Sequence, residues 1–258
     1  MDNKIKIFVI THKKYKFPEN EIYIPLHVGK NNKESLGYIG DDTGDNISYK
    51  NSNYCELTGL YWMWKNVNDC NIIGLNHYRR YFTIKNNIFE KNKFKLILTT
   101  EQIENLMNNY DIVVSNKKRI LFKNVYQNYA QQHYIKDLDK CKEIISKKCP
   151  EYIDSFDKIM NQNKMSICNM FITKKEIMDN YSKWLFDILF ELEKNIDMTG
   201  YSKLQKRVYG FLSERLFNVW LEKNSNLRIG YLPIIKLEHD SLKTIIKKSY
   251  KRIMKIKS

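Results

Sequence analysis

The stretch Gly74-Leu75-Asn76-His77-Tyr78-Arg79-Arg80-Tyr81-Phe82 indicates how the rest of the chain folds. The apolar run 71–75 that leads into it has the composition of a strand buried on both faces of a parallel sheet. Polar and basic side chains follow at once. Because ligands of open α/β folds collect outside the carboxyl ends of the strands, we expect a binding site at this point.

The adjacent arginines Arg79 and Arg80 are the first candidates for an anion site. A guanidinium is planar, stays charged at any working pH and pairs with phosphate or carboxylate through two parallel hydrogen bonds. A structural alternative is open here, in which one arginine reaches solvent and the other ties down a loop. Asn76 and His77 stand at the same strand end and are candidates for the same site.

Length and composition predict one α/β domain with insertions. A chain of 258 residues, of which 43% are hydrophobic, can build one sizeable core. The longest apolar runs, 5–10 and 184–190, fall far short of the roughly 20 residues that cross a bilayer. We therefore expect no transmembrane helix, a domain at 1–240 and a basic tail at 241–258.

Cysteine usage and the amino terminus predict a cytoplasmic protein. The cysteines are odd in number and show no C-x-x-C spacing, which favours reduced thiols over disulfides or a zinc site. The first apolar run is too short for the core of a signal peptide, and no small-residue cleavage site follows it.

The formal net charge of +15 points to an anionic partner or to lysine drift on a solvated surface. After Asp240 the chain has seven basic residues and no acid, and its apolar residues there fall on one helical face. This layout predicts a peripheral helix on the anionic inner-membrane surface, with a frayed solvated terminus as the alternative. Nucleic acid is a rival partner, but no RRM, helix-turn-helix or finger pattern occurs, so none is expected.

Strands and helices alternate over residues 1–116, which predicts a mostly parallel mixed sheet. An Asn53–Glu56 capping box is expected to start a helix that continues to about Val67. The second half is more helical, with helices expected at 137–148, 150–160, 174–195 and 204–222, and strands at 165–173 and 227–235.

Three further places carry candidate residues. Thr11, His12 and Lys13 form a second polar cluster at the end of the first strand. Asn169 lies inside the predicted strand 165–173, either as a satisfied core amide or as a substrate contact. Glu214 shares a helix flank with Arg207, although a solvated salt-bridging face would give the same spacing.

Longer blocks of sequence resemble a known family. The blocks are 45–48, 50–51, 54–62, 64–66, 73–75, 77–82, 133–134, 169–171, 184–186 and 205–216, and they run in order over about 4–221. This series resembles the bacterial capsule and exopolysaccharide glycosyltransferase family catalogued as a domain of unknown function of the DUF4422 type. The resemblance implies a GT-A-like nucleotide-sugar-binding fold and transfer of a hexosyl unit, in some members galactofuranosyl, from a UDP-sugar to a lipid-linked oligosaccharide.

The resemblance also suggests roles for named residues. Glu214 is the expected general base, because many inverting GT-A enzymes carry an acceptor-side carboxylate on a late helix, and His133 is the reserve. Catalytic partners, which neutralise the leaving diphosphate or lie beside it, are Arg79, Arg80 and His77. Donor-binding candidates are Thr11, His12, Lys13, Asp45, Asn46, Lys50, Asn51 and Asn76. Acceptor-binding candidates are His133, Tyr134, Asn169, Gln205 and Arg207.

The expected metal site departs from the GT-A pattern. GT-A enzymes commonly hold Mn²⁺ or Mg²⁺ with a strand-end Asp-x-Asp, where this chain has Asn76-His77-Tyr78. Arginines can supply the positive charge in place of an ion, so metal dependence is open. Asp137-Leu138-Asp139 and the pair Asp41-Asp42 are the remaining metal candidates. A sugar-phosphate transferase, which releases UMP and not UDP, is the closest alternative activity.

Overall fold

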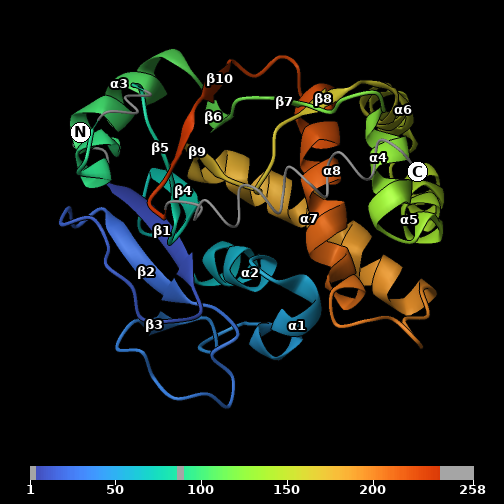
Figure 1. Ribbon diagram of the computed structural model, residues 1–258, viewed down its shortest axis with the longest axis horizontal. Coiled ribbons are helices and arrows are strands. Elements are labelled where there is room, and N and C mark those ends of the chain that lie inside the picture. Colours follow the sequence, from blue (N-terminus) through green and yellow to red (C-terminus); the bar gives the residue numbers. More distant parts are fainter. Residues whose placement is uncertain (1–3, 86–89, 239–258) are drawn as a thin grey trace.

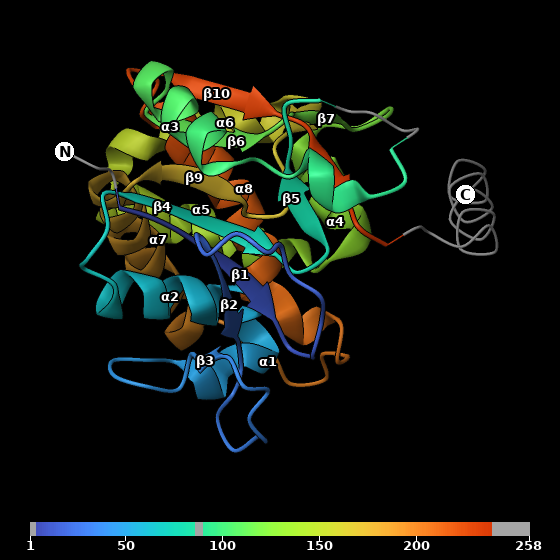
Figure 2. The same ribbon diagram turned by 90° about the vertical axis from the view of Figure 1, so that its left-hand side faces the viewer.

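A twisted sheet forms the centre of the computed structural model, which describes residues 4–85 and 90–238. Its strands are β1 Ile5–Thr11, β2 Tyr23–His27, β3 Ile39–Gly40, β4 Ile72–His77, β5 Arg80–Phe82, β6 Ile112–Ser115, β9 Phe171–Lys174, β10 Ile229–Leu232 and β11 Ile234–Lys236. The main path runs β10-β6-β9-β4-β1-β2-β3, from top to bottom in Figure 2. A separate pair joins β7 Lys118–Arg119 and β8 Lys164–Met165.

The sheet is mixed in a way that places two strand ends side by side. β1 pairs in parallel with both β2 and β4, so the carboxyl ends of β1 and β4 meet at one edge. β9 runs antiparallel between β4 and β6, and the short β5 folds back from β4 to pair with β11. β1 is buried along almost its whole length, as expected of a strand covered on both faces.

Helices cover both faces of the sheet. Their bounds are α1 Asn51–Tyr54, α2 Leu57–Asn66, α3 Thr100–Asn109, α4 Val125–Gln132, α5 Ile135–Lys148, α6 Ile153–Asn161, α7 Lys175–Asn195 and α8 Val208–Lys223. Short 3-10 turns lie at Ser48–Lys50, Lys93–Leu96, Pro150–Tyr152 and Gln205–Arg207. In Figure 1, α3 lies on one side of the sheet, and α2, α7 and α8 lie on the other.

Strand alternation divides the core into two clusters. Phe8, Ile10, Ile73 and Leu75 pack toward α2, α7 and α8. Ile7, Val9 and Ile72 pack toward α3, β5 and β11. Since successive residues of a strand face opposite sides, this assignment also decides which strand-end side chains share a face.

Two elements differ from the sequence expectation. The predicted strand 165–173 is broken, because Cys168 and Asn169 adopt left-handed φ values of 78° and 48° and turn the chain between β8 and β9. Asn169 is therefore in a turn and not inside a strand. The predicted capping box at Asn53 is wrong: Asn53 lies within α1, and its amide donates to the carbonyl of Lys206.

Other expectations hold. The helix α7 has nearly the predicted bounds, and α3 begins with a capping box formed by Thr99 and Gln102. All of the cysteines are free thiols. In the two described ranges, no helix combines the length and the apolar character needed to cross a membrane. The boundary at 240 and the basic tail 241–258 lie outside the described residues.

Candidate active site

A cavity of about 700 Å³ opens at the carboxyl ends of β1 and β4. It lies on the α2 and α8 face of the sheet, because His77 shares the face of Ile73 and Leu75 along β4, and these two residues pack toward α2, α7 and α8. In the described part of the chain its charged lining comprises two carboxylates and a larger group of cations. The lining residues are Ile10, His12, Val28, Asn51, Ser52, Cys55, Glu56, His77, Tyr78, Arg79, Arg80, Cys168, Lys203, Arg207 and Glu214.

A turn at Cys168 and Asn169 organises the floor of this cavity. The Cys168 N–H donates to Glu214 Oε1 at 2.9 Å, and its carbonyl accepts from His77 Nε2 at 2.7 Å. The next side chain, Asn169, donates to Glu56 Oε1 at 2.9 Å and to Ser213 Oγ at 2.7 Å. Consecutive left-handed residues other than glycine cost about 1–3 kcal/mol each and gather at functional sites. The strained turn thus connects three side chains from β4, the α1–α2 junction and α8.

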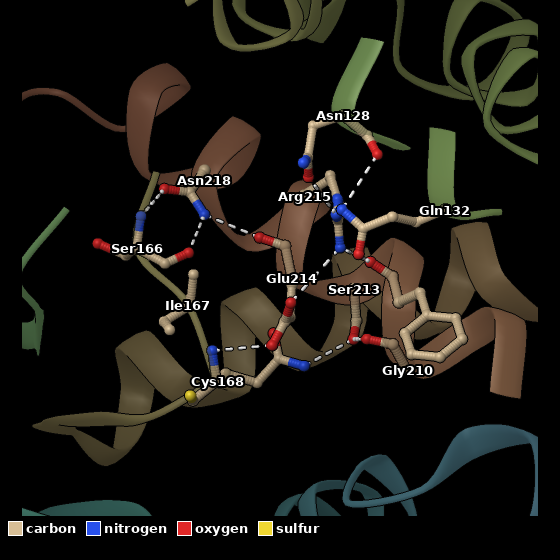
Figure 3. A network of polar contacts seen from close by, with 12 residues as sticks. Asn128, Gln132, Ser166, Ile167, Cys168, Gly210, Ser213, Glu214, Arg215 and Asn218 are labelled. Atoms are coloured by element: carbon tan, nitrogen blue, oxygen red, sulfur yellow. Dashed lines mark hydrogen bonds and ion pairs between the residues drawn. The ribbon is translucent and has the colours of Figure 1, made fainter. Parts of the chain in front are cut away.

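Glu214 is the better oriented of the two carboxylates. Figure 3 shows its carboxylate between the Cys168 backbone and the Arg215 guanidinium, which lies 3.4 Å from Oε2. The Glu214 side chain is 27% exposed, whereas Arg215 is 7% exposed and lies behind it. Burial raises the pKa of Glu214, and the Arg215 charge opposes part of that rise. One face of the carboxylate is therefore held in place while the group borders the cavity.

Arg215 is fixed by other parts of the α8 and α4 region. It donates to the carbonyl of Phe211 at 3.0 Å and to Asn128 Oδ1 at 3.4 Å. Asn218, one turn further along α8, donates to the Glu214 carbonyl and to the Ser166 carbonyl. Figure 3 shows these bonds converging around Glu214 from α8 and from the segment 166–168. The bonds to Asn128 and Ser166 join residues far apart in the chain, so no local sequence pattern predicts the supporting network.

Glu56 is the carboxylate that the sequence analysis missed as a site residue. The sequence predicts Glu56 to be part of a helix cap. In the structure Glu56 does stand at the N-cap position of α2, but its side chain makes no capping hydrogen bond and instead accepts one from the Asn169 amide. Burial raises the pKa of Glu56, and the bond from Asn169 counteracts the rise. An acidic residue next to the strongly apolar run 57–64 was the signal that could have identified it.

His77 is neutral in this environment. Burial lowers its pKa to about 4, while the hydrogen bond to the Cys168 carbonyl works in the opposite direction. With Nε2 donating to that carbonyl, Nδ1 carries no proton at neutral pH. The neutral ring positions the turn and adds no charge to the cavity.

The cations of the cavity differ in how they are paired. Arg79 forms an ion pair with Glu238 at 2.9 Å and lies over the Tyr78 ring. Arg207 donates through Nε to Cys55 Sγ at 3.1 Å. The Arg80 side chain has no hydrogen-bond or ion-pair partner among residues 4–85 and 90–238. Its guanidinium, on the strand β5, and the exposed ammonium group of Lys203 are the charges of the cavity that are available to an incoming anion.

Both thiols of the cavity are weak nucleophiles. Burial raises the pKa of Cys55 and that of Cys168 to about 11 each. Because the thiolate is the reactive form, neither cysteine is suited to covalent catalysis at neutral pH.

The structure places the strand-end and α1 candidates for donor binding on different faces of the sheet. His12 and Asn51 line the cavity, and Lys13 lies beside it, over the ring of Tyr78. Thr11 and Asn76 are fully buried on the opposite face of the sheet. Thr11 donates to the Lys13 carbonyl at 2.6 Å, so it shapes the strand end.

The loop 41–50 uses its polar candidates within the fold. Asp45 accepts from the Tyr61 hydroxyl at 3.0 Å, and Asn46 accepts from the Ser48 N–H in an Asx turn. Lys50 forms an ion pair with Glu193 at 2.6 Å. Asp45, Asn46 and Lys50 are not among the residues that line the cavity.

The acceptor candidates are likewise divided. Arg207 lines the cavity, and Asn169 lies directly behind it through Glu56. His133 stacks on Phe211 at 4.0 Å and contacts Gln205 Oε1 at 3.1 Å. Tyr134 is exposed and packs on Tyr201. His133, Tyr134 and Gln205 lie around the 3-10 turn Gln205–Arg207 and are not part of the cavity lining.

The residues do not form the carboxylate cluster that a GT-A metal site would use. In the part of the chain that the structure describes, no three His, Cys, Asp or Glu side chains are grouped to hold an ion. Asp137 accepts from Tyr201 and Asp139 from Tyr126, while Asp41 accepts from the Ser48 hydroxyl and the Gly29 N–H. The cavity mouth carries arginines, which repel a divalent cation.

A second cavity of about 700 Å³ lies at the opposite edge of the sheet, at the amino end of β4 and the carboxyl end of the antiparallel strand β9. Its cations are neutralised within the fold, since Arg228 pairs with Asp111 and Lys175 with Asp179. Of its two lining carboxylates, Asp179 is used in the ion pair with Lys175 and Glu176 is exposed on α7. The carboxyl-end cavity is therefore the candidate active site.

Three comparisons relate the chain to known proteins. A solved structure, the apo form of the bifunctional glycosyltransferase WbbM, superposes with a TM-score of 0.86 at 34% identity. The match covers 92% of this chain and 46% of that one, so the present chain spans about half the length of its relative. No curated protein matches. The superposition confirms the GT-A-like α/β fold expected from the sequence. A model of a domain of unknown function matches residues 6–225, and the chain therefore belongs to the DUF4422 family.

Proposed function

We propose that the protein is a glycosyltransferase that moves a hexosyl unit from a UDP-sugar to a lipid-linked oligosaccharide. The observation that carries the proposal is the meeting of Glu214, Glu56 and an unpaired Arg80 in one cavity at the carboxyl ends of β1 and β4. A 34% identical structure of a bifunctional glycosyltransferase supports the same reaction class. Synthesis of capsule, exopolysaccharide or O-antigen is the proposed context, and galactofuranose is the first donor sugar to test.

Glu214 is proposed as the general base that takes the proton of the acceptor hydroxyl. A base works best when its pKa lies near the working pH, and burial shifts the pKa of Glu214 in that direction. The bonds from Cys168 and Arg215 fix the carboxylate before the acceptor arrives, which avoids reorganisation during the reaction. Glu56, held by Asn169, is proposed to accept hydrogen bonds from sugar hydroxyls beside it.

Arg80 is proposed to take up the negative charge of the departing nucleotide diphosphate. A fixed guanidinium stabilises charge that develops in the transition state without a metal ion. Arg207 and Arg79 line the same cavity, and Arg79 would have to exchange its ion pair with Glu238 for the ligand. His12 and Asn51 lie at the β1 and α1 side, where the nucleoside is proposed to bind. We propose a metal-independent reaction for this reason.

The membrane part of the proposal concerns the tail 241–258, which lies outside the described residues. Its basic, amphipathic sequence is proposed to hold the protein at the inner face of an anionic membrane, close to a lipid-linked acceptor.

A donor panel tests the proposal. The purified protein is incubated with UDP-galactofuranose, UDP-galactose, UDP-glucose and UDP-N-acetylglucosamine, each with and without EDTA, and the nucleotide product is measured. Hydrolysis or transfer that releases UDP and resists EDTA is expected for one of them. Release of UMP would instead identify a sugar-phosphate transferase, and absence of turnover together with absence of UDP binding would contradict the proposed function.

A further inference from the structure

A smaller cavity, of about 270 Å³, adjoins the candidate active site. The two share Arg80 and Cys168, so the guanidinium of Arg80 borders both. The smaller cavity is lined by Arg80, Ser115, Asn116, Lys118, Ile167, Cys168, Pro233, Ile234 and Lys236. Its described lining contains three cations and no carboxylate.

The strand register places two of these cations directly opposite each other. In the antiparallel pair of β5 and β11, Arg80 is the cross-strand partner of Lys236. On its other side, Arg80 is the partner of His77 in the pairing of β5 with β4. Directly opposed residues of antiparallel strands share a face, so His77, Arg80 and Lys236 form one row across three strands. The row leads from the active site into the smaller cavity.

Like charges that face each other across strands destabilise a sheet. In the described ranges, Arg80, Lys118 and Lys236 have no ion pair, whereas nearby Arg79 and Lys13 are both within reach of Glu238. Within this part of the chain no carboxylate forms an ion pair with Arg80 or Lys236, and the carboxylate charge that acts on Arg80 comes from the side of the larger cavity, where Glu56 lies. An anion between Arg80 and Lys236 would convert an unfavourable pair into two charge-assisted contacts.

The charge of the cavity indicates which kind of anion it binds, and its position indicates from which side that anion enters. Three cations around a small cavity match the multiple charge of a phosphate or diphosphate better than that of a single carboxylate. The cavity lies beside the end of β6 and the segment 167–168, whereas His12 and Asn51, at the proposed nucleoside end, line only the larger cavity. The anion would thus enter from the side opposite the donor nucleotide.

We propose that Arg80, Lys118 and Lys236 form a subsite for a phosphate or diphosphate group carried by the acceptor substrate. This inference rests on the proposed function, because it assigns the acceptor side of the same site. It adds that the acceptor is recognised through its charge as well as through its sugar hydroxyls.

Inorganic pyrophosphate, titrated calorimetrically into the full chain saturated with UDP, tests the subsite. Wild-type protein is expected to bind pyrophosphate in addition to UDP. The double variant Lys118→Ala with Lys236→Ala should weaken pyrophosphate binding about tenfold or more, since it removes two charge-assisted contacts. UDP affinity should change less than about twofold, because both lysines line only the smaller cavity. Lys164→Ala, an exposed lysine of β8 outside both linings, is the matched control.

A stability measurement separates binding from a structural role. Lys236→Ala removes the charge opposite Arg80, so its Tm without ligand should be equal to or higher than that of the wild type. Pyrophosphate affinity that is unchanged in the double variant overturns the subsite, as does a lowered Tm with no loss of binding. If pyrophosphate competes with UDP and the double variant weakens both, the donor occupies the cavity and the acceptor assignment is wrong. Should wild-type protein bind no UDP, the proposed function fails, and titration without UDP still decides whether the lysines bind phosphate.

Discussion

Glu214 and Glu56 face the same cavity but are held by different contacts, and this difference supports different roles. Glu214 accepts a backbone N–H and contacts a buried arginine, so its position is fixed by α8 and the turn at Cys168. Glu56 depends on one side-chain amide, from Asn169. A fixed carboxylate that borders an open cavity suits proton abstraction, because a general base must first lie within hydrogen-bond reach of the proton and must then have a pKa near the working pH.

Replacing Glu214 by Gln should reduce kcat by about 10²–10⁴-fold, the usual contribution of a general base. The amide can still accept the Cys168 N–H, and UDP affinity should change by no more than about threefold. Glu222→Gln on the same helix, where the carboxylate pairs with Lys158 at the surface, is the matched control. Initial rates with the preferred donor provide the measurement. Turnover within about twofold of wild type would exclude Glu214 as the base.

His77 should make the fold sensitive to mild acid. Its pKa is lowered to about 4 in the folded protein, against 6.5 for the ordinary side chain. Between these values the unfolded chain binds a proton that the folded chain does not, so stability is lost as pH falls from 6.5 toward 4. From pH 8 to pH 5 this group should cost about 2 kcal/mol.

Urea unfolding of wild type and His77→Gln at pH 8 and pH 5 measures this contribution. The variant retains a donor for the Cys168 carbonyl, and its loss of unfolding free energy should be smaller than that of wild type by about 2 kcal/mol. Equal losses in the two proteins would show that His77 is not held neutral by the fold.

At the scale of elements, the turn between β8 and β9 controls how the site is assembled. It joins β4 through His77, α8 through Glu214 and the α1–α2 junction through Glu56. The left-handed backbone at Cys168 presents its N–H and its carbonyl to two different site residues. Backbone strain is therefore stored where the catalytic groups are held.

Two small substitutions at Cys168 isolate that strain. Cys168→Gly should be about 1 kcal/mol more stable than Cys168→Ala, because glycine adopts a φ of 78° without the steric cost that a Cβ brings. Both variants lose the thiol, whose pKa of about 11 already excludes it as a nucleophile, so both should keep activity within about threefold. Chemical denaturation and initial rates are the measurements. Inactivation of both variants would instead assign the thiol a direct role.

The sequence could predict the elements more readily than this turn. Helical periodicity predicted α7 closely, and the composition of β1 and β4 predicted buried parallel strands. The segment 165–173 has the composition of one strand, but long-range bonds hold its left-handed residues: Cys168 bonds to Glu214 and His77, and Asn169 bonds to Glu56 and Ser213. Such bonds leave no local pattern in the chain.

The sequence likewise predicted one part of the site and missed another. The strand-end rule predicted His12, His77, Arg79 and Arg80, which the structure brings into one cavity. The same rule included Thr11 and Asn76, although alternation along β1 and β4 turns them to the other face. Glu56 was missed because its position before α2 also fits a helix cap, and the bond from Asn169 is a tertiary contact.

At the scale of the whole molecule, the sheet divides the proposed chemistry between two sides. The end of β1 and α1 supply His12 and Asn51, which are assigned to the donor nucleoside, and α8, positioned by the segment 166–169, supplies the assigned base. Arg80 lies at the boundary, bordering both the large and the small cavity.

The central claim is that this cavity binds a nucleotide diphosphate through an unpaired arginine, and calorimetric titration with UDP tests it most directly. Wild-type protein should bind UDP, and Arg80→Ala should weaken that binding by about tenfold or more, since a charge-assisted contact contributes about 1.5–3 kcal/mol. Arg119→Ala, an exposed arginine of β7 outside both cavities, should leave the affinity unchanged. Failure of wild-type protein to bind UDP, or equal affinities for wild type and Arg80→Ala, would contradict the claim.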